Sequence, residues 1–401
     1  MKIKLGVIFG GTSVEHEISI ISAVQAMQSI DQNKYDIVPI YIGKDRTWYT
    51  GKMLMDIDVY KDFEDLKKYA TKVVLYKKDN SFVLQKLGLF KNVVEELDVV
   101  FPIVHGAGVE DGSLAGYLET VGIPFVGPHV LGAALGQDKV VMKQVFASEK
   151  LPIVDYTWFY DTEYLNDSKD ILKNIKKIGY PVIVKPATLG SSVGITVVKD
   201  EKKIEEAIED AINYDSKIVV EKLVDNLVEV NCSVVGNYDY QEASVLEEVM
   251  STDEFLTYKD KYLGGSKTKT GGSKGMASTD RVIPARLSKD LTKDIQETSK
   301  KIFKVLGLSG ICRIDFLIDK KANKFYINEP NTIPGSLSFY LWDPSGKPYP
   351  ELLDEVITLA IKDYKIKSKK TTSFDTNILS NFGGLKGAKG VKGAVKGKLN
   401  S

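Results

Sequence analysis

Short, uniformly apolar runs alternate in the first third of the chain with segments whose apolar residues recur at helical spacing. Residues 5–9 form such a run, which ends at Gly10 and Gly11, and apolar residues then recur between positions 18 and 27 as on one face of a helix. Residues 36–42 and 99–104 are further runs typical of strands that a sheet buries on both faces. Strands joined through helices predict an N-terminal α/β domain with a parallel sheet, over residues 1–138.

The rest of the chain predicts two lobes that are richer in strands. The first, over residues 139–224, is a small mixed α/β lobe. Its expected elements are a helix at 139–149, strands at 182–185, 195–198 and 218–221, and a helix at 201–212. The second lobe covers residues 225–370. Its expected elements are strands at 228–234, 246–250, 310–318 and 324–328 and a helix at 289–306.

Two segments have no apolar periodicity. Residues 264–279 consist largely of Gly, Ser, Lys and Thr. A loop of this length in a compact domain is typical of a lid that covers a binding site, and the alternative is a plain surface loop. From residue 371 to 401 the chain becomes rich in Lys and Gly. We expect a flexible, solvated basic tail there rather than an anion-binding segment.

Composition narrows the possible partners. Lys plus Arg equals Asp plus Glu, 54 against 54, which argues against a nucleic-acid partner and favours a small polar or anionic substrate. The two cysteines, Cys232 and Cys312, lie in strand-like runs, which excludes a disulfide framework or a cysteine-rich zinc site and fits a reducing cytoplasm. No apolar run approaches about 18 residues, so we expect a cytoplasmic protein without membrane insertion.

The most informative chemistry lies in two neighbouring strands near the C-terminal end. Arg313 and Asp315 stand in one apolar run, and Glu329 and Asn331 end the next. Hard divalent cations prefer oxygen ligands, so Asp315, Glu329 and Asn331 are candidate Mg²⁺ ligands against nucleotide phosphates. Arg313 could neutralise charge that develops on a reacting oxygen. The plainer alternative is that these carboxylates are solvated or ion-paired.

The loop from Gly190 to Gly194 fits two templates. It has the Gly-x-Ser-x-Gly pattern of a hydrolase, yet all three histidines lie upstream of Ser192, where an α/β-hydrolase requires one downstream. No Walker loop occurs either. What remains is a small-residue loop that follows Lys185, whose ammonium could contact a phosphate.

Four motifs, over residues 10–19, 105–112, 184–194 and 329–335, resemble in order those of the D-alanine–D-alanine ligases. The resemblance covers roughly residues 1–365. It implies an α/β chain with an ATP-grasp fold, in which two lobes clamp the nucleotide beside the N-terminal domain. It also implies D-alanine as substrate, ATP with Mg²⁺ (two ions, or Mn²⁺ in their place), and a homodimer.

The resemblance also implies residue roles. Contacts to ATP would come from Lys139, Lys185, Ser192, Glu221, Lys222, Glu229 and Lys261. Metal ligands would be Asp315, Glu329 and Asn331, and Arg313 and the Gly335 N–H would form the oxyanion site. Glu15 would position the amino acid that binds first, and Ser191 and Tyr262 would hydrogen-bond with Glu15 and tie the lid over the site. His105 would border the first substrate, and Tyr340 and Leu341 the second.

Several of these residues have plainer explanations. Thr12-x-x-Glu15 is also a capping box at the start of a helix. Glu221 and Lys222 could be an exposed strand end, and His105 a satisfied strand-end histidine. Glu229 is offset by one residue from the family spacing.

Departures from the family make the second substrate the least defined. Leu256 replaces a common Tyr, the segment 264–279 is longer and richer in lysine than usual, and Tyr340 stands where a Ser commonly binds the second carboxylate. Tyr262 favours D-alanine as acceptor. The alternatives are D-lactate or D-serine as acceptor, another ATP-grasp carboxylate–amine ligation, and nucleotide binding without catalysis.

Overall fold

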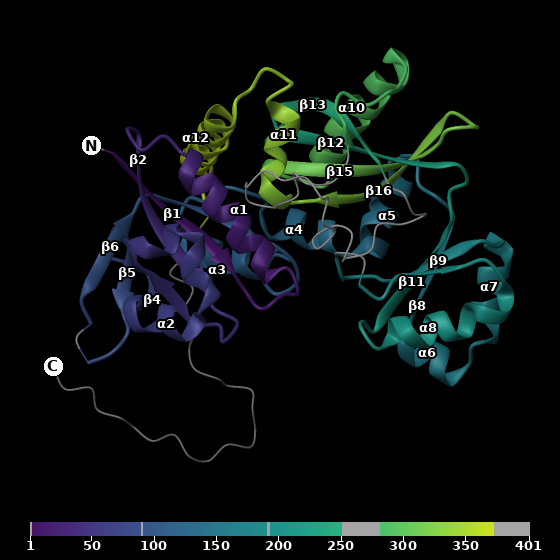
Figure 1. The fold of residues 1–401 in the computed structure, drawn as a ribbon, viewed down its shortest axis with the longest axis horizontal. Helices are drawn as coiled ribbons and strands as arrows, with labels where there is room; N and C mark the ends of the chain where they lie inside the picture. Colours follow the sequence, from purple (N-terminus) through teal and green to yellow (C-terminus); the bar gives the residue numbers. More distant parts are fainter. Residues whose placement is uncertain (1, 90, 191–192, 251–280, 373–401) are drawn as a thin grey trace, which may run out of the picture. The chain divides into compact units, whose positions relative to one another are not determined.

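The computed structural model describes residues 2–89, 91–190, 193–250 and 281–372 of the 401-residue chain. Three β-sheets organise these residues (Figure 1). Residues 1–362 form one compact unit and residues 363–401 a second. Among the described helices, none combines the length and the apolar character needed to cross a membrane.

The N-terminal sheet has seven strands in the order β6-β5-β4-β3-β2-β1-β7. Its parallel part comprises β1 (Ile3–Gly10), β2 (Tyr35–Ile42) and β7 (Val99–Val104), as the apolar runs predicted. Its antiparallel part comprises β3 (Trp48–Thr50), β4 (Thr71–Lys78), β5 (Ser81–Lys86) and β6 (Val93–Leu97). The sheet is therefore mixed rather than wholly parallel, because strands such as β4 alternate buried and exposed residues outside the doubly covered centre.

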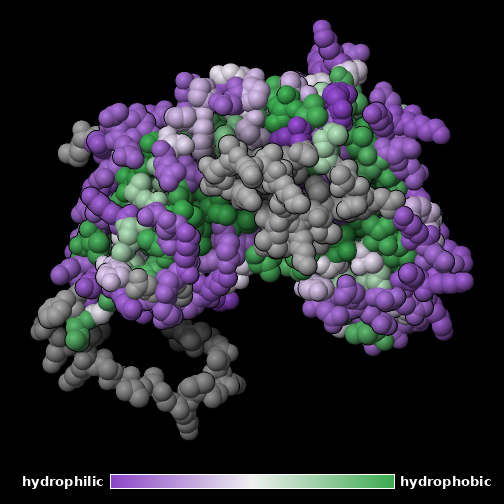
Figure 2. All heavy atoms as spheres, viewed as in Figure 1, coloured by the Kyte–Doolittle hydropathy of each residue, from purple (hydrophilic) through white to green (hydrophobic). Residues whose placement is uncertain are grey.

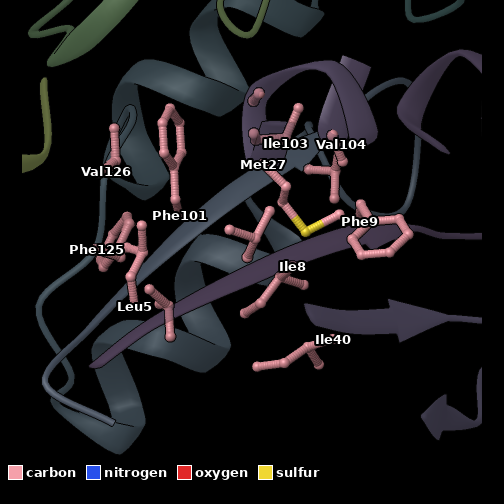
Figure 3. Packing of buried hydrophobic residues seen from close by; sticks show 14 of the residues in the cluster. Leu5, Ile8, Phe9, Met27, Ile40, Phe101, Ile103, Val104, Phe125 and Val126 are labelled. Atoms are coloured by element: carbon pink, nitrogen blue, oxygen red, sulfur yellow. The ribbon is translucent and has the colours of Figure 1, made fainter. Parts of the chain in front are cut away.

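Apolar side chains of the parallel strands pack against α1 (His16–Ser29) at the centre of this domain (Figure 3). Leu5, Ile8 and Met27 are fully buried. Burying one such side chain stabilises the fold by about 1.5–3 kcal/mol, so the end of β1 that leads into the site is held firmly. The other helices here are η1 (Lys52–Met55), η2 (Ile57–Lys61), α2 (Phe63–Tyr69), α3 (Ser113–Val121) and α4 (Val130–Gln137).

Helix α1 does not begin with the capping box that the sequence suggested. Its N-cap residue is Glu15, whose side chain makes no capping hydrogen bond. Instead, the backbone N–H of Glu15 donates to Ser13 Oγ at 3.2 Å. Thr12 lies outside the helix because the chain turns at Gly10 and Gly11, both with positive φ. The Glu15 carboxylate is thus not engaged in capping the helix.

The second sheet is antiparallel, in the order β10-β9-β11-β8. Its strands are β8 (Tyr156–Tyr160), β9 (Val182–Pro186), β10 (Thr196–Val198) and β11 (Lys217–Lys222). The helices of this region are α5 (Lys139–Ser148), α6 (Asp161–Asn166), α7 (Lys169–Ile178), η3 (Glu201–Lys203) and α8 (Ile204–Ile212). Helix α7 turns Ile175 into the core, and Figure 2 shows hydrophilic residues gathered over α7 and α8 at lower right.

The third sheet is also antiparallel, in the order β14-β13-β12-β15-β16. Its strands are β12 (Leu227–Gly236), β13 (Gln241–Val249), β14 (Arg281–Val282), β15 (Gly310–Asp319) and β16 (Lys324–Asn331). The helices are α10 (Lys289–Val305), η5 (Gly335–Ser338), α11 (Phe339–Trp342) and α12 (Tyr349–Lys367). Cys232 and Cys312 are free thiols buried in β12 and β15.

Two helices pack away from their neighbours in sequence. Met142 and Phe146 of α5 join the core beneath the third sheet. Val356 and Ile357 of α12 join the core of the N-terminal domain instead. Packing between elements that are distant in sequence therefore holds in place the strands and helices that line the candidate site.

Candidate active site

A cleft of about 820 Å³, open solvent included, is lined by residues of the second and third sheets. Its described apolar lining comprises Ile183, Leu189, Ile195, Leu223, Val224, Leu227, Phe316 and Leu317. Its charged lining comprises Lys139, Lys185, Glu221, Lys222, Glu229, Asp315 and Glu329. The seven residues just named as charged are all residues to which the sequence assigned ATP or metal contacts.

Glu221 is not an exposed strand end, because it is only 1% exposed. Lys185 Nζ lies 2.9 Å from its Oε2, and Lys143 Nζ lies 3.2 Å from its Oε1. Burial alone would raise the pKa of Glu221, but the two ammonium groups outweigh it and lower the pKa to about 2. Lys222 Nζ, by contrast, donates to the carbonyl oxygens of Gly179 and Tyr180 at 3.0 and 3.1 Å.

Lys139, the first residue of α5, connects the cleft to Glu329 of β16. Its Nζ lies 3.0 Å from Glu329 Oε2 and donates to the Leu189 carbonyl at 2.8 Å. Burial favours the neutral amine, but the Glu329 carboxylate outweighs it and the pKa of Lys139 is raised. The side chain of Asp138 caps the helix by accepting hydrogen bonds from Val140 and Val141, so the position of Lys139 is set by local structure.

Strands β15 and β16 bring the candidate metal and oxyanion residues together. Asp315 pairs with Glu329 in the register and Arg313 with Asn331. Arg313 holds Asp315 through two hydrogen bonds, Nε–Oδ1 at 2.7 Å and Nη2–Oδ2 at 2.8 Å. Asn331 Nδ2 donates to Asp315 Oδ2 at 3.0 Å. Residues two apart on a strand share one face, so the spacing in the sequence correctly predicted their proximity.

The donor set suits a hard cation that is also coordinated by a ligand. Asp315, Glu329 and Asn331 supply carboxylate and amide oxygens only, the chemistry that Mg²⁺ prefers. In the part of the chain that the structure describes, no three His, Cys, Asp or Glu side chains converge into a metal site. Two carboxylates and one amide leave further positions for phosphate oxygens or water.

A second pocket adjoins the cleft and shares Lys139, Leu189, Gly190 and Glu329 with it. The rest of its described lining comprises Glu15, Ile18, His105, Glu110, Gly136, Gln137, Arg313, Pro330, Asn331, Thr332, Ile333 and Gly335. The predicted first-substrate residues and the predicted oxyanion residues thus face one space.

Two titratable side chains of this pocket, those of the buried His105 and the half-buried Glu110, have perturbed pKa values. Burial lowers the pKa of His105 to about 4, so its imidazole is neutral at pH 7; its Nε2 lies 3.1 Å from Ser22 Oγ. Burial, and then the nearby charge of Glu15, raise the pKa of Glu110 to about 7. The Glu110 carboxylate accepts hydrogen bonds from the backbone N–H groups of Gly106 (2.9 Å) and Ile333 (3.1 Å).

Gly335 opens an unusual turn. Ser336, Leu337 and Ser338 follow it with φ near +50°, a conformation that residues with side chains rarely adopt. The backbone N–H of Ser336 donates to Ser22 Oγ at 2.9 Å, which ties the turn to α1. The N-terminal domain therefore helps to hold the turn that Gly335 begins.

Tyr340 and Leu341 are not among the described residues that line either pocket. Tyr340 donates its hydroxyl to Glu247 Oε1 at 3.0 Å, and the Arg281 guanidinium lies 4.1 Å from the centre of its ring. Leu341 is fully buried. Their assignment to the second substrate stays a prediction.

Some predicted features lie outside the described residues. These are Ser191, Ser192, Lys261, Tyr262 and the segment 264–279, together with Leu256 and most of the C-terminal tail.

Sequence reasoning missed two residues that the structure places at the site, Glu110 and Lys143. Glu110 lies inside the motif at residues 105–112, but its acidic side chain gave no sign of burial. Lys143 follows Lys139 by four residues and so shares its helix face, a signal that could have found it.

Two family models match the chain. One described as D-ala D-ala ligase N-terminus matches residues 4–128, and one described as D-ala D-ala ligase C-terminus matches residues 145–358. A D-alanine–D-alanine ligase from Thermosipho melanesiensis is 41% identical over 378 residues, which cover 94% of this chain and 98% of the relative. One from Caldicellulosiruptor bescii is 38% identical over 93% of this chain and 98% of the relative.

Solved structures agree. The D-alanine–D-alanine ligase from Coxiella burnetii matches with a TM-score of 0.75 and 28% identity, over 95% of this chain and 98% of that one. The VanG D-Ala:D-Ser ligase from Enterococcus faecalis matches with a TM-score of 0.75 and 30% identity, over 90% of this chain and 100% of that one.

Proposed function

Because the chain belongs to the D-alanine–D-alanine ligase family and has its ATP-grasp fold, we propose that it joins two D-alanine molecules at the expense of ATP. The product is D-alanyl-D-alanine, a precursor of peptidoglycan. The observation that carries the proposal is the shared boundary of the two pockets, at Lys139 and Glu329. A phosphate in the cleft and a carboxylate in the pocket would meet there.

ATP binds in the cleft. The apolar lining suits a purine, with Glu221 and Lys222 beside the adenine and Glu229 beside the ribose. Lys139 and Lys185 contact the phosphates, an assignment supported by their positions next to Glu329 and Asn328. Ser192 and Lys261 complete the phosphate contacts in this proposal.

Asp315, Glu329 and Asn331 hold divalent cations, two Mg²⁺ ions or Mn²⁺ in their place. Their oxygen donors and common strand faces support this assignment. Bound there, the cations would offset the negative charge of the phosphates.

The first D-alanine lies in the second pocket, where Glu15 accepts from its ammonium group and His105 borders it. Its carboxylate attacks the γ-phosphorus of ATP, and ADP leaves, giving an acyl phosphate. Lys139 and Lys185 stabilise the charge on the transferred group, because carboxylates already hold both ammonium groups in place.

The amine of the second D-alanine then attacks the acyl carbon, and phosphate leaves. Arg313 and the Gly335 N–H stabilise the tetrahedral oxyanion. Ser191 and Tyr262 link Glu15 to a lid formed by residues 264–279. In this proposal the lid excludes water from the acyl phosphate. Tyr340 and Leu341 border the second substrate.

D-serine is the one alternative acceptor with an observation in its favour, namely the similarity to a D-Ala:D-Ser ligase. The D-alanine–D-alanine ligases from Thermosipho melanesiensis and Caldicellulosiruptor bescii match at higher identity, 41% and 38%, over similar coverage, and Tyr262 favours D-alanine, so D-alanine remains the proposal. We also propose a cytoplasmic homodimer. The free buried cysteines suit a reducing compartment.

Phosphate release from ATP, measured with single and paired D- and L-amino acids and with D-lactate, tests the proposal when each product is identified by mass. D-alanyl-D-alanine should be the main product with D-alanine alone. A main product containing another acceptor when all compete would refute the specificity, and no D-alanine-dependent phosphate release would refute the activity.

A further inference from the structure

Lys143 has no part in the reaction proposed above, yet it occupies a costly position. Its side chain is fully buried on α5, one turn after Lys139. The Nζ atom lies 3.2 Å from Glu221 Oε1 and has no further hydrogen-bond partner among the described residues. The aromatic ring of Tyr156 is also near, with its centre 5.9 Å from Lys143 Nζ. Burial lowers the pKa of Lys143, and the Glu221 carboxylate is the group that offsets part of this effect.

The carboxylate of Glu221 is divided between two lysines. Lys185 takes Oε2 at 2.9 Å, and Lys143 faces Oε1. The two lysines differ in access, since Lys185 lines the cleft and Lys143 is not among its lining residues. In the proposed function Lys185 also contacts the phosphates, so Lys143 is the cation that serves Glu221 alone. A buried carboxylate that loses every cation becomes easier to protonate.

The ionisation of Glu221 decides which purine it can accept. An ionised carboxylate accepts hydrogen bonds and donates none. Adenine presents an amino donor at C6, whereas hypoxanthine and guanine present a carbonyl acceptor there. A fixed, ionised Glu221 beside the base thus attracts the C6 amino group of adenine and repels the C6 carbonyl group of hypoxanthine or guanine. A Glu221 side chain that moves or is protonated discriminates less between the two.

We propose that Lys143 is a positioning residue that keeps Glu221 ionised and oriented, and thereby sets the preference of the cleft for 6-amino over 6-oxo purine nucleotides. The inference rests on the proposed function in one respect, the assignment of the cleft to the nucleotide. It adds a specificity determinant that lies behind the cleft wall rather than in it.

The test compares ATP with ITP, because inosine differs from adenosine at C6. Lys143→Met removes the charge and keeps much of the side-chain volume. We expect it to reduce the ratio of ATP to ITP affinity, measured by calorimetry without D-alanine, by about tenfold or more, the worth of a charged hydrogen bond. The kcat/KM ratio should fall likewise, while KM for D-alanine stays unchanged.

Lys217→Met is the matched control. Lys217 lies on β11 with Glu221 and is itself ion-paired, to Asp138 at 2.6 Å. The Lys217→Met variant should keep the wild-type ratio of ATP affinity to ITP affinity. A wild-type ratio in Lys143→Met, or an equal fall in both variants, would overturn the proposal.

A double-mutant comparison covers the case in which Lys143→Met fails to fold. If Lys143 acts through Glu221, the variant with both Lys143→Met and Glu221→Gln should show the ATP to ITP ratio of Glu221→Gln alone. A further fall in the double variant would overturn the proposal. Failure of the ligase function is distinguishable, because the binding ratio is measured without D-alanine.

Discussion

Replacing Glu110 with Gln should change how the free energy of unfolding depends on pH. The Glu110 carboxyl is half-buried, and partial burial together with the nearby charge of Glu15 raises its pKa from the ordinary value of 4.5 to about 7. A pKa that is higher in the folded than in the unfolded chain means that folding favours the protonated form. The stability from this group is therefore fully present below about 4.5 and is lost as the pH rises through about 7.

The magnitude follows from the difference in pKa. Rising from 4.5 to about 7 is a difference of about 2.5, and each pKa unit corresponds to about 1.4 kcal/mol, so the group contributes a fall of about 3 kcal/mol between pH 5 and pH 8. Gln cannot ionise. The free energy of unfolding of Glu110→Gln should therefore lack this fall between pH 5 and pH 8. The contributions of titratable groups that both proteins share cancel when the two proteins are compared.

Urea unfolding of both proteins at pH 5, 6, 7 and 8 measures the difference. We expect Glu110→Gln to be less stable than wild type at pH 5, because its amide cannot accept from both Gly106 and Ile333 as the carboxyl does. The gap should narrow or reverse by pH 8. Asp111→Asn is the control, because it makes the same acid-to-amide change at a partly exposed neighbour, which accepts from Gly108 at 2.7 Å. Parallel curves for Glu110→Gln and wild type would refute the reasoning.

Three further predictions concern activity. Asp315→Ala and Glu329→Ala should each abolish Mg²⁺-dependent phosphate release with an unchanged circular dichroism spectrum, because the phosphates lose charge compensation; near-normal turnover would remove the metal assignment. Arg313→Ala should lower kcat by about 10²-fold or more and change KM for D-alanine little, whereas an effect on KM alone would indicate ground-state binding. Gly106→Ala and Gly108→Ala both place Ala at a φ of +83°, and each should lower the free energy of unfolding in urea by about 1–2 kcal/mol. Only the new Cβ at position 106 would lie within 2.8 Å of Glu15 Oε2, so only Gly106→Ala should raise KM for D-alanine. Equal KM values in the two variants would show that Glu15 does not contact the substrate.

Elements that are buried on both faces were predictable from the sequence. The runs that became β1, β2 and β7 are almost wholly apolar, and the placement of Asp315 and Glu329 on successive strands predicted that they lie close together. Half-exposed elements were not predicted, among them β8, α7 and the antiparallel strands β3 to β6. The alternation of these strands is weak and their burial depends on what packs over them. Helix α7 was missed although the sequence carries a helical signal, since Ile171, Leu172, Ile175 and Ile178 recur at helical spacing.

The partners of the charged residues were less predictable than their positions. That Arg313 holds Asp315 follows from strand geometry, since the two are two residues apart on one face. That Lys143 and Lys185 share Glu221 depends on how α5, β9 and β11 pack, which no local pattern specifies. The left-handed turn at residues 336–338 was equally hidden, because Ser and Leu give no signal for positive φ.

The ion pairs of the site explain how its buried charges can serve ligands without being left alone. Asp315 is paired with Arg313, and Glu329 with Lys139. A cation that approaches the carboxylates brings phosphates toward the ammonium and guanidinium groups, so each protein charge exchanges one opposite charge for another. A buried charge stripped of its partner would cost several kcal/mol, whereas an exchange avoids that cost. Binding of the nucleotide and of the cation should therefore be strongly coupled, and neither should bind tightly in the absence of the other.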